Sequence, residues 1–202
     1  MTTRRWLGTI LVVCFCVAMA GCKSATRTRV DAKDTRESEK PAPAAPTGFT
    51  ASQVRSADDM PQLREAALSG DANAMFLLGR EHFIGRYVPR NMSAAKAWFE
   101  QAHQADSAAG TNALGVIYYE SLGVEQDYAV AMALFIESAS AGSAKAMRNI
   151  GRMYEGGHGV EADNAEALVW YEKAMAAAGD DVNLKRVLTE MIANVKAADA
   201  QP

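Results

Sequence analysis

AMRNIGRMYEGGHGVEADNAEALVW, residues 146–170, is the third copy of a pattern that recurs every 36 residues along the chain. A pair of an aliphatic residue and a glycine marks each copy: Leu78-Gly79, Leu114-Gly115 and Ile150-Gly151. The same period joins further sets of matching residues: Val88, Val124 and Val160; Asn91, Asp127 and Asp163; Ala95, Ala131 and Ala167; Trp98, Leu134 and Trp170; Phe99, Phe135 and Tyr171. A fixed period shared by so many positions indicates a repeat protein, in which each unit buries its apolar surface against the next.

Each copy is expected to fold as two helices. In the second half of the first copy, apolar residues keep the spacing of one helix face: Ala95, Trp98, Phe99 and Ala102. Glycine-rich segments separate the two halves of each copy, and glycine readily takes the positive φ that ends a helix. A residue suited to the N-cap of the second helix then follows: Asn91, Asp127 and Asp163. Each copy therefore predicts a helix-turn-helix unit.

Three glycines fall inside the first helices of these units, at positions 79, 115 and 151. Glycine within a helix is less stable than alanine by about 1 kcal/mol. We therefore expect a neighbouring helix to cross closely at each of these glycines. The side chains expected to stack in the core are Leu78, Leu114, Ile150, Trp98, Phe135 and Trp170.

The order Ala-x-x-x-Leu-Gly-x-x-Tyr, Gly-x-Gly-Val-x-x-Asp, Ala-x-x-Trp resembles the Sel-1-like repeat (SLR), a relative of the tetratricopeptide repeat. The match covers about residues 70–178, as repeats at about 70–105, 106–141 and 142–178. Three residues depart from the pattern, since His82, Leu134 and Ser121 replace a tyrosine, a tryptophan and a glycine. The resemblance implies an all-α, right-handed α-solenoid of about three repeats within residues 51–202.

Capping helices are expected at both ends of so short a stack. Residues 58–68 predict one, with Pro61 near its start. Residues 181–197 predict the other, with an apolar face of Leu184, Val187, Leu188, Met191, Ile192 and Val195. An alternative role for this second face is binding to a partner or a membrane.

The N-terminus predicts a targeting segment. Arg4 and Arg5 precede an uncharged run over residues 6–20, which is shorter than the roughly 20 residues of a membrane span. The segment Met19-Ala20-Gly21-Cys22 resembles the end of a bacterial lipoprotein signal, which implies removal of residues 1–21 and acylation of Cys22. Residues 22–50 then predict a disordered tether rich in proline and charge. The alternative is a short uncleaved anchor. Lys23, which follows the cysteine, resembles the residue found at this position in lipoproteins sorted to the outer membrane. The folded part would then face the periplasm.

The sequence contains few of the residues and motifs that enzymes use for catalysis. All three cysteines lie within residues 1–22, so the remainder can hold neither a disulfide nor a cysteine nucleophile. The motifs Gly-x-Ser-x-Gly, His-Glu-x-x-His and Cys-x-x-Cys and the P-loop are absent from the sequence, and the three histidines are too scattered to predict a metal site. The net charge of −3 argues against nucleic-acid binding. We therefore predict a protein that is not an enzyme and has no metal or cofactor.

In the related tetratricopeptide fold, ligands lie against the first helix of each pair, on the concave face. Carrying that register over places these residues on the face: Asn73, Phe76, Arg80, Phe83, Asn112, Val116, Tyr119, Lys145, Arg148, Arg152 and Glu155. Arginines beside aromatic residues favour a protein partner with an acidic segment. The alternative is that these arginines are solvated or pair with acids inside the repeats.

A tethered repeat module without catalytic motifs predicts an adaptor or scaffold in the cell envelope that binds a partner protein. Three alternatives stay open. The first is an immunity-type protein that sequesters a toxic effector, and the second is a spacer without a discrete partner. The third is a hydrolase, for which the chain lacks the repeat cysteines of certain relatives.

Overall fold

The computed structural model describes residues 48–199. The predicted signal peptide, Cys22 and most of the predicted tether lie outside these residues. The described part contains eight α-helices and two short 3-10 turns, and no strand. The 3-10 turns are Ala51–Gln53 and Ala57–Asp59, and the helices are α1 Met60–Leu68, α2 Ala72–Ile84, α3 Met92–Gln104, α4 Ala108–Tyr119, α5 Tyr128–Ser140, α6 Ala144–Gly156, α7 Asn164–Ala177 and α8 Val182–Asp199. The predicted all-α class is confirmed.

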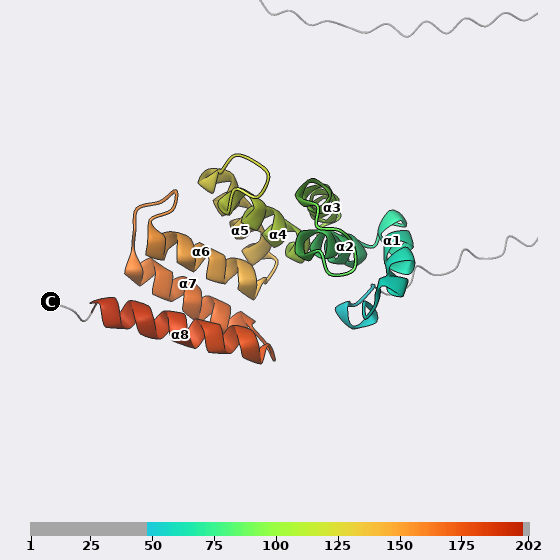
Figure 1. Ribbon diagram of the computed structural model, residues 1–202. Coiled ribbons are helices and arrows are strands. Elements are labelled where there is room, and N and C mark those ends of the chain that lie inside the picture. The colour runs from blue at the N-terminus through green and yellow to red at the C-terminus, as the bar shows by residue number, and fades with distance from the viewer. Residues whose placement is uncertain (1–47, 200–202) are drawn as a thin grey trace, which may run out of the picture. The chain divides into compact units, whose positions relative to one another are not determined.

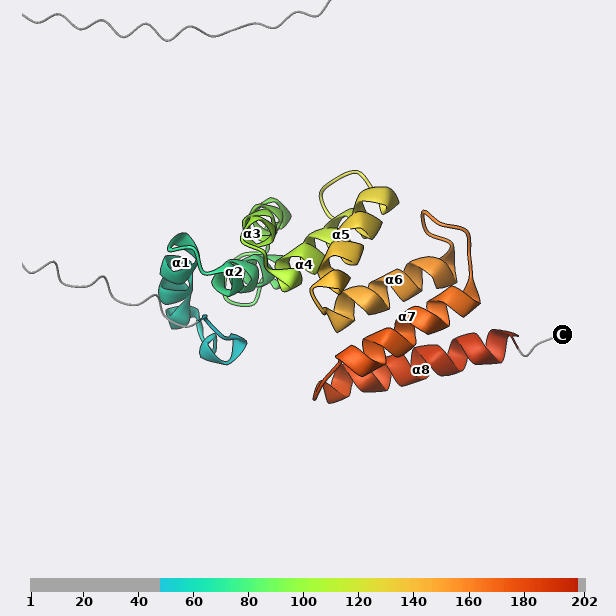
Figure 2. The same ribbon diagram turned by 180° about the vertical axis from the view of Figure 1, so that it is seen from behind.

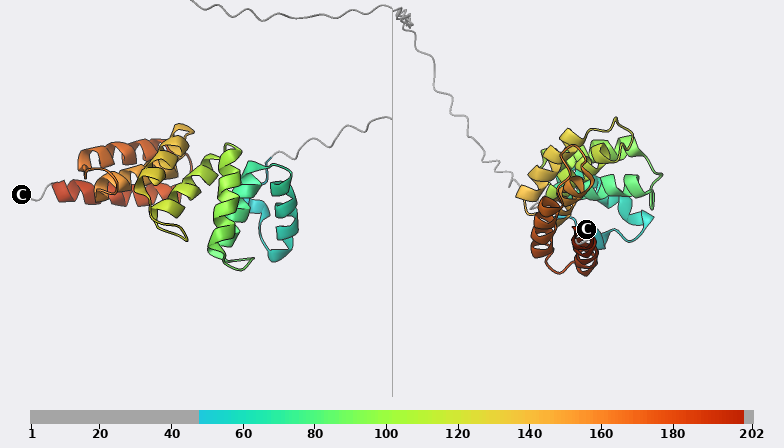
Figure 3. Two further views of the ribbon diagram at one scale, coloured as in Figure 1. Left: turned by 90° about the horizontal axis from the view of Figure 1, so that it is seen from above. Right: turned by 90° about the vertical axis from the view of Figure 1, so that its left-hand side faces the viewer.

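Successive helices pack against each other in chain order, from α1 to α8 (Figures 1 and 2). The pairs α2/α3, α4/α5 and α6/α7 are the three repeats, with α1 before them and α8 after them. The row can also be followed from above in Figure 3. In addition, α2 contacts α4 and α6 contacts α8, while a hydrogen bond joins Asn149 of α6 to Asn112 of α4. The even-numbered helices thus form one row, and we call the surface they share the inner face.

Side-chain caps begin the second helix of every repeat at the predicted residues. The carboxamide or carboxylate oxygens of Asn91, Asp127 and Asp163 accept backbone N–H groups in the first turns of α3, α5 and α7. Gly85 and Gly157 end α2 and α6 in the left-handed conformation, with φ of +79° and +65°. The equivalent residue after α4 is Ser121, which adopts φ of +55° without being glycine.

The three mid-helix glycines are the crossing points of the paired helices. A Cβ at Gly79 would lie 2.7 Å from the ring of Phe99, and one at Gly115 would lie 2.6 Å from the ring of Phe135. Gly151 faces the ring of Tyr171 in the same way. These separations are far inside van der Waals contact, so only glycine lets the rings approach. The expected close crossing is confirmed.

The prediction of which aromatic residues fill the core was partly wrong. Trp98 and Trp170 are only partly buried, whereas the residues that follow them, Phe99 and Tyr171, are almost completely buried. The ring that reaches the glycine of the facing helix belongs to the later residue of each pair. Trp170 instead lies where the Lys173 ammonium group sits 4.2 Å from its ring centroid. The predicted burial of Leu78, Leu114, Ile150 and Phe135 is confirmed.

The end helices use their apolar faces for packing. α1 buries Met60, Leu63 and Ala67 in a cluster with the first residues of α2. α8 buries Leu184, Leu188 and Val195 against α7, with Met191 and Ile192 partly buried beside them. The face that membrane binding would need is therefore mostly covered by the fold. Within residues 48–199, no helix has both the length and the apolar content to cross a membrane.

Candidate functional site

The predicted partner-binding residues lie on α2, α4 and α6, but the structure divides them into separate groups. Those of α2 are held by contacts within the fold. The Asn73 amide donates a hydrogen bond to the backbone carbonyl of Phe49. Phe76 packs beside Phe99, with ring centroids 6.1 Å apart, and Phe83 is half-buried near the second repeat. The α2 part of the predicted surface is largely occupied by the chain itself.

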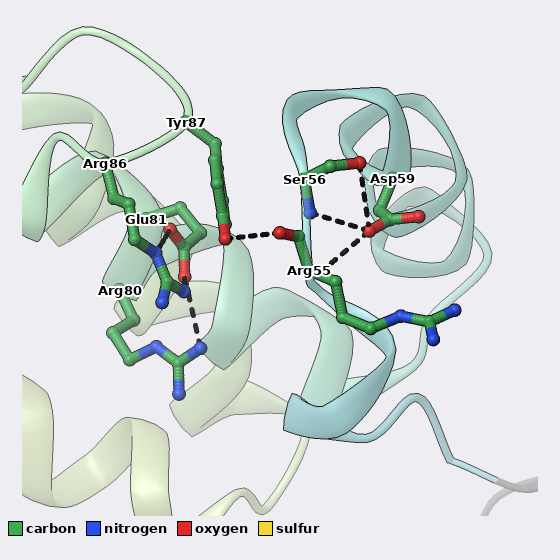
Figure 4. Close-up of polar contacts among 7 residues, drawn as sticks. All are labelled: Arg55, Ser56, Asp59, Arg80, Glu81, Arg86 and Tyr87. Carbon is green, nitrogen blue, oxygen red and sulfur yellow. Dashed lines mark hydrogen bonds and ion pairs between the residues drawn. The ribbon is translucent and has the colours of Figure 1, made fainter.

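Arg80 is part of an ion-pair cluster around a carboxylate that sequence reasoning missed. Glu81 is completely buried, and its Oε1 accepts hydrogen bonds from Arg80 Nη2 at 3.1 Å and Arg86 Nη2 at 2.7 Å. Figure 4 shows both guanidinium groups directed at this carboxylate. Hydrogen bonding to Glu81 raises the pKa of Arg86. Arg80 is therefore neutralised inside the repeat, which is the alternative that the sequence left open.

The neighbouring Tyr87 fastens the start of the described chain to the first repeat. Its hydroxyl donates a hydrogen bond of 2.6 Å to the backbone carbonyl of Arg55 (Figure 4). The Asp59 carboxylate accepts the N–H groups of Arg55 at 2.7 Å and Ser56 at 2.9 Å. These hydrogen bonds lower the pKa of Asp59. Residues 55–59 are thus held against α2 by polar contacts as well as by the burial of Met60.

Tyr119 and Arg152 belong to a second cluster, where α4 meets α6. The Arg152 guanidinium lies 5.1 Å from the ring centroid of Tyr119 and pairs with Glu120 at 3.5 Å. A hydrogen bond of 2.6 Å joins the Tyr119 hydroxyl to His158 Nδ1, and His158 stacks on Tyr128 with centroids 5.2 Å apart. Burial raises the pKa of Tyr119. This cluster joins the second and third repeats.

Glu155, which was expected on the same face, also has a partner inside the third repeat. The hydroxyl of the buried Tyr171 donates a hydrogen bond to Glu155 Oε2. Burial, followed by this hydrogen bond, raises the pKa of Tyr171. The exposed carboxylate of Glu155 is therefore tied to the core through the Tyr171 ring that covers Gly151.

Arg148 and Lys145 form a third group, and they differ from the other inner-face cations. In the described part of the chain, no ion pair includes either residue. Arg148 Nη2 donates a hydrogen bond to Asn149 Oδ1 at 3.2 Å, while its buried Nε has no acceptor. Burial, followed by the charge of Arg152, lowers the pKa of Arg148. A cation held in this way remains available to an external anion.

A hollow of about 330 Å³ opens beside these two cations, between α6 and the start of α8. Its lining residues come from both helices and the cap of α8: Lys145, Arg148, Asp181, Asn183, Leu184 and Val187. The volume is at the lower end of the range for ligand pockets in proteins, roughly 300–1,000 Å³. The structure thus places two of the predicted residues in one open site and adds a wall from α8.

The site residues that the sequence missed are those whose roles depend on distant neighbours. Glu81 lies in a helix without any charge pattern that marks it as buried, and His158 lies in a glycine-rich turn. No set of three His, Cys, Asp or Glu residues within 48–199 has the arrangement to hold a metal ion. The geometry of the inner face offers charge and shape for binding.

Comparisons with known proteins agree with the repeat pattern. A family model described as the Sel1 repeat matches residues 72–106, 108–143 and 144–178, just over half of the chain. These segments coincide with the pairs α2/α3, α4/α5 and α6/α7. A search of curated proteins gives no match.

Two solved structures share the fold. One is c5321, a protective antigen present in uropathogenic Escherichia coli strains that displays an SLR fold; it is 34% identical, over 60% of this chain and 26% of that chain, with a TM-score of 0.55. The other is a Sel1 repeat protein from Oxalobacter formigenes, 33% identical over 65% of this chain and 98% of that chain, with a TM-score of 0.52. The similar region spans about a quarter of the length of the Escherichia coli antigen.

Proposed function

The chain belongs to the Sel1 repeat family, whose members are protein–protein interaction modules, and we propose that it binds a segment of a partner protein along the inner face of α4, α6 and α8. The observation that carries this proposal is the open hollow between α6 and α8, lined by two cations that form no ion pair within the described residues. The α2 end of the face is closed by Phe49 and by the Glu81 cluster. The surface that we propose for binding is therefore shorter than the one expected from the sequence.

The partner is expected to carry an acidic segment. Arg148 and Lys145 offer positive charge to it beside the hollow. Arginine is enriched among the residues that dominate protein interfaces. An acidic segment laid along α6 would meet both cations in turn.

Site-specific photo-crosslinking in the source organism tests the binding surface. A photoreactive amino acid is placed at Val116 or Asn183 on the inner helices, and at the exposed Gln101 or Ala133 on the odd-numbered helices as matched controls. We expect the inner positions to give the same crosslinked protein and the control positions to give none. Crosslinks to that protein from Gln101 and Ala133 alone would place binding on the opposite face and overturn the proposal.

We further propose that the module is anchored to the cell envelope through a lipid on Cys22, facing the periplasm. The support is the sequence Met19-Ala20-Gly21-Cys22 after an uncharged run. Two or more acyl chains give stable membrane anchoring, whereas one gives only marginal binding. Mass spectrometry of the native N-terminus should find an acylated Cys22. An intact Met1, or an unmodified Cys22 at the N-terminus, would overturn this proposal.

A further inference from the structure

The hollow between α6 and α8 has a charge that selects a particular kind of group. Lys145 and Arg148 contribute two positive charges, and Asp181 contributes one negative charge. Asp181 Oδ1 accepts the backbone N–H of Leu184 at 2.9 Å, so this carboxylate caps the start of α8. No ion pair in the described residues joins Asp181 to either cation. One positive charge is left over, which matches a single carboxylate.

The other arginines of the inner helices form ion pairs, whereas Arg148 forms none with the residues that the structure describes. Arg80 pairs with Glu81, Arg152 with Glu120 and, on α8, Arg186 with Glu190 at 2.9 Å. Arg80 and Arg148 each have a buried Nε without an acceptor, but Arg148 lacks the ion pair that Arg80 makes with Glu81. A buried polar group without a hydrogen-bond partner opposes folding. The fold therefore tolerates a cation that is unfavourable until an anion reaches it.

The walls of the hollow suit the stem of an acidic side chain. Leu184 and Val187 of α8 line one side, opposite the two cations of α6. A guanidinium group binds a carboxylate through two parallel hydrogen bonds, which fixes the direction of approach. The methylene groups of a glutamate would contact the aliphatic wall while its carboxylate reaches Arg148. Asp181 would repel a phosphate group, with up to two negative charges, more strongly than a singly charged carboxylate.

We propose that this hollow is a specificity pocket, in which Arg148 and Lys145 bind a glutamate side chain of the partner segment and α8 forms the opposite wall. This inference rests on the proposed binding along the inner face. It gives α8 a role in recognition beyond that of an end cap. It also assigns the selection of the acidic group to Arg148, while Arg152 and Arg80 serve the structure of the repeats.

Thermal unfolding of the full-length chain, purified in detergent, tests whether Arg148 destabilises the fold. The measurement needs no partner protein. We expect Arg148→Met to melt at the same temperature as the wild type or higher. Arg186→Met is the matched control, because Arg186 lies on α8, is exposed and already pairs with Glu190. A clear fall in the melting temperature of Arg148→Met, larger than that of Arg186→Met, would make Arg148 a structural residue and overturn the inference.

An array of immobilised octapeptides tests the selectivity. One central position is fixed as glutamate, glutamine or phosphoserine, and the others are varied. For the wild-type chain we expect glutamate peptides to bind about tenfold more tightly than their glutamine counterparts, since hydrogen bonds between charged groups are stronger than those to a neutral amide. The preference should disappear in Arg148→Met, fall in Lys145→Met and persist in Arg186→Met.

The two arms separate this inference from the function on which it rests. Equal binding of glutamate and glutamine peptides overturns the pocket, even if crosslinks from Val116 and Asn183 still show a partner on the inner face. A preference for phosphoserine over glutamate also overturns it, because the site would then select phosphate. If inner-face crosslinks are absent and glutamate selectivity is intact, the proposed function is contradicted. The pocket would then still bind glutamate side chains, but not as part of a partner segment along the inner face.

Discussion

The ring of Tyr171 fills the space in which a side chain at residue 151 would stand, so that Gly151 is the point at which α6 and α7 cross. The same relation holds between Gly115 and Phe135, and between Gly79 and Phe99. In each pair the two residues are separated by the turn between the helices. This contact sets the distance between the helices of every repeat.

Replacing Gly151 by alanine should therefore destabilise the protein. Alanine is the better helix former by about 1 kcal/mol. Its Cβ would overlap the Tyr171 ring, and overpacking of this kind usually reduces the free energy of unfolding by about 1–3 kcal/mol. Urea unfolding of Gly151→Ala should thus show a net loss of stability. In a Tyr171→Ala background the same change should become neutral or stabilising, and a cost that persists there would contradict the contact.

Adjacent aromatic residues in α7 should differ in their importance for stability. Tyr171 is completely buried and Trp170 only partly so. We expect Tyr171→Ala to reduce the free energy of unfolding by about 3–5 kcal/mol, as for other large buried aromatics. Trp170→Ala should reduce it by about 1 kcal/mol, a typical value for single substitutions. Denaturant titrations of the two variants compare them directly, and equal losses would refute the assignment.

Glycine in place of Ser121 should stabilise the second repeat. Ser121 adopts a left-handed conformation that glycine takes in the other two repeats, and this conformation opposes a residue with a Cβ by roughly 1–2 kcal/mol. The exposed hydrogen bond from Ser121 Oγ to the Val124 carbonyl, of 2.9 Å, offsets part of that gain. We expect Ser121→Gly to raise the melting temperature followed by circular dichroism. Ser121→Ala, which loses the hydroxyl and keeps the strain, should lower it.

The local conformation of residues 55–59 should weaken in acid. Hydrogen bonds from the Arg55 and Ser56 N–H groups lower the pKa of Asp59 from its ordinary value of 3.8. Because the folded pKa is lower than the unfolded one, the stabilisation is present above pH 3.8 and is lost as the pH falls through the folded value. The protection of these two amides against hydrogen exchange, relative to the intrinsic exchange rate at each pH, should fall there. In Asp59→Asn the exchange rates should lack this acid transition.

Local features of the fold could be predicted from the sequence because they depend on neighbours along the chain. The caps at Asn91, Asp127 and Asp163 require only an acceptor before a helix, and the glycines at positions 79, 115 and 151 signal close packing by their unfavourable placement. Neighbours along the chain do not show which of Trp170 and Tyr171 is the buried residue. Both belong to a plausible apolar stripe, and the crossing of α6 over α7 decides which one is buried.

The binding surface was harder to predict because it depends on which charges find partners in the folded chain. Arg80 and Glu81 are adjacent in sequence, and adjacent residues on a helix do not ordinarily face each other. Their pairing is completed by Arg86 from the following turn. In the same way, Arg152 is neutralised by Glu120 of the preceding repeat, which leaves Arg148 as the open guanidinium of α6. No spacing rule distinguishes these arginines.

The first α-helix, α1, packs like the second member of a pair, and the last, α8, packs like a first member. The three complete repeats between them have nearly the same length and share the contact between a glycine of the first helix and an aromatic ring of the second. A duplicated copy of residues 108–143, inserted after residue 143, would therefore meet compatible neighbours on both sides. Lengthening by duplication would add inner-face surface while keeping both end helices, so the reach of this module can evolve separately from its selectivity at α6 and α8.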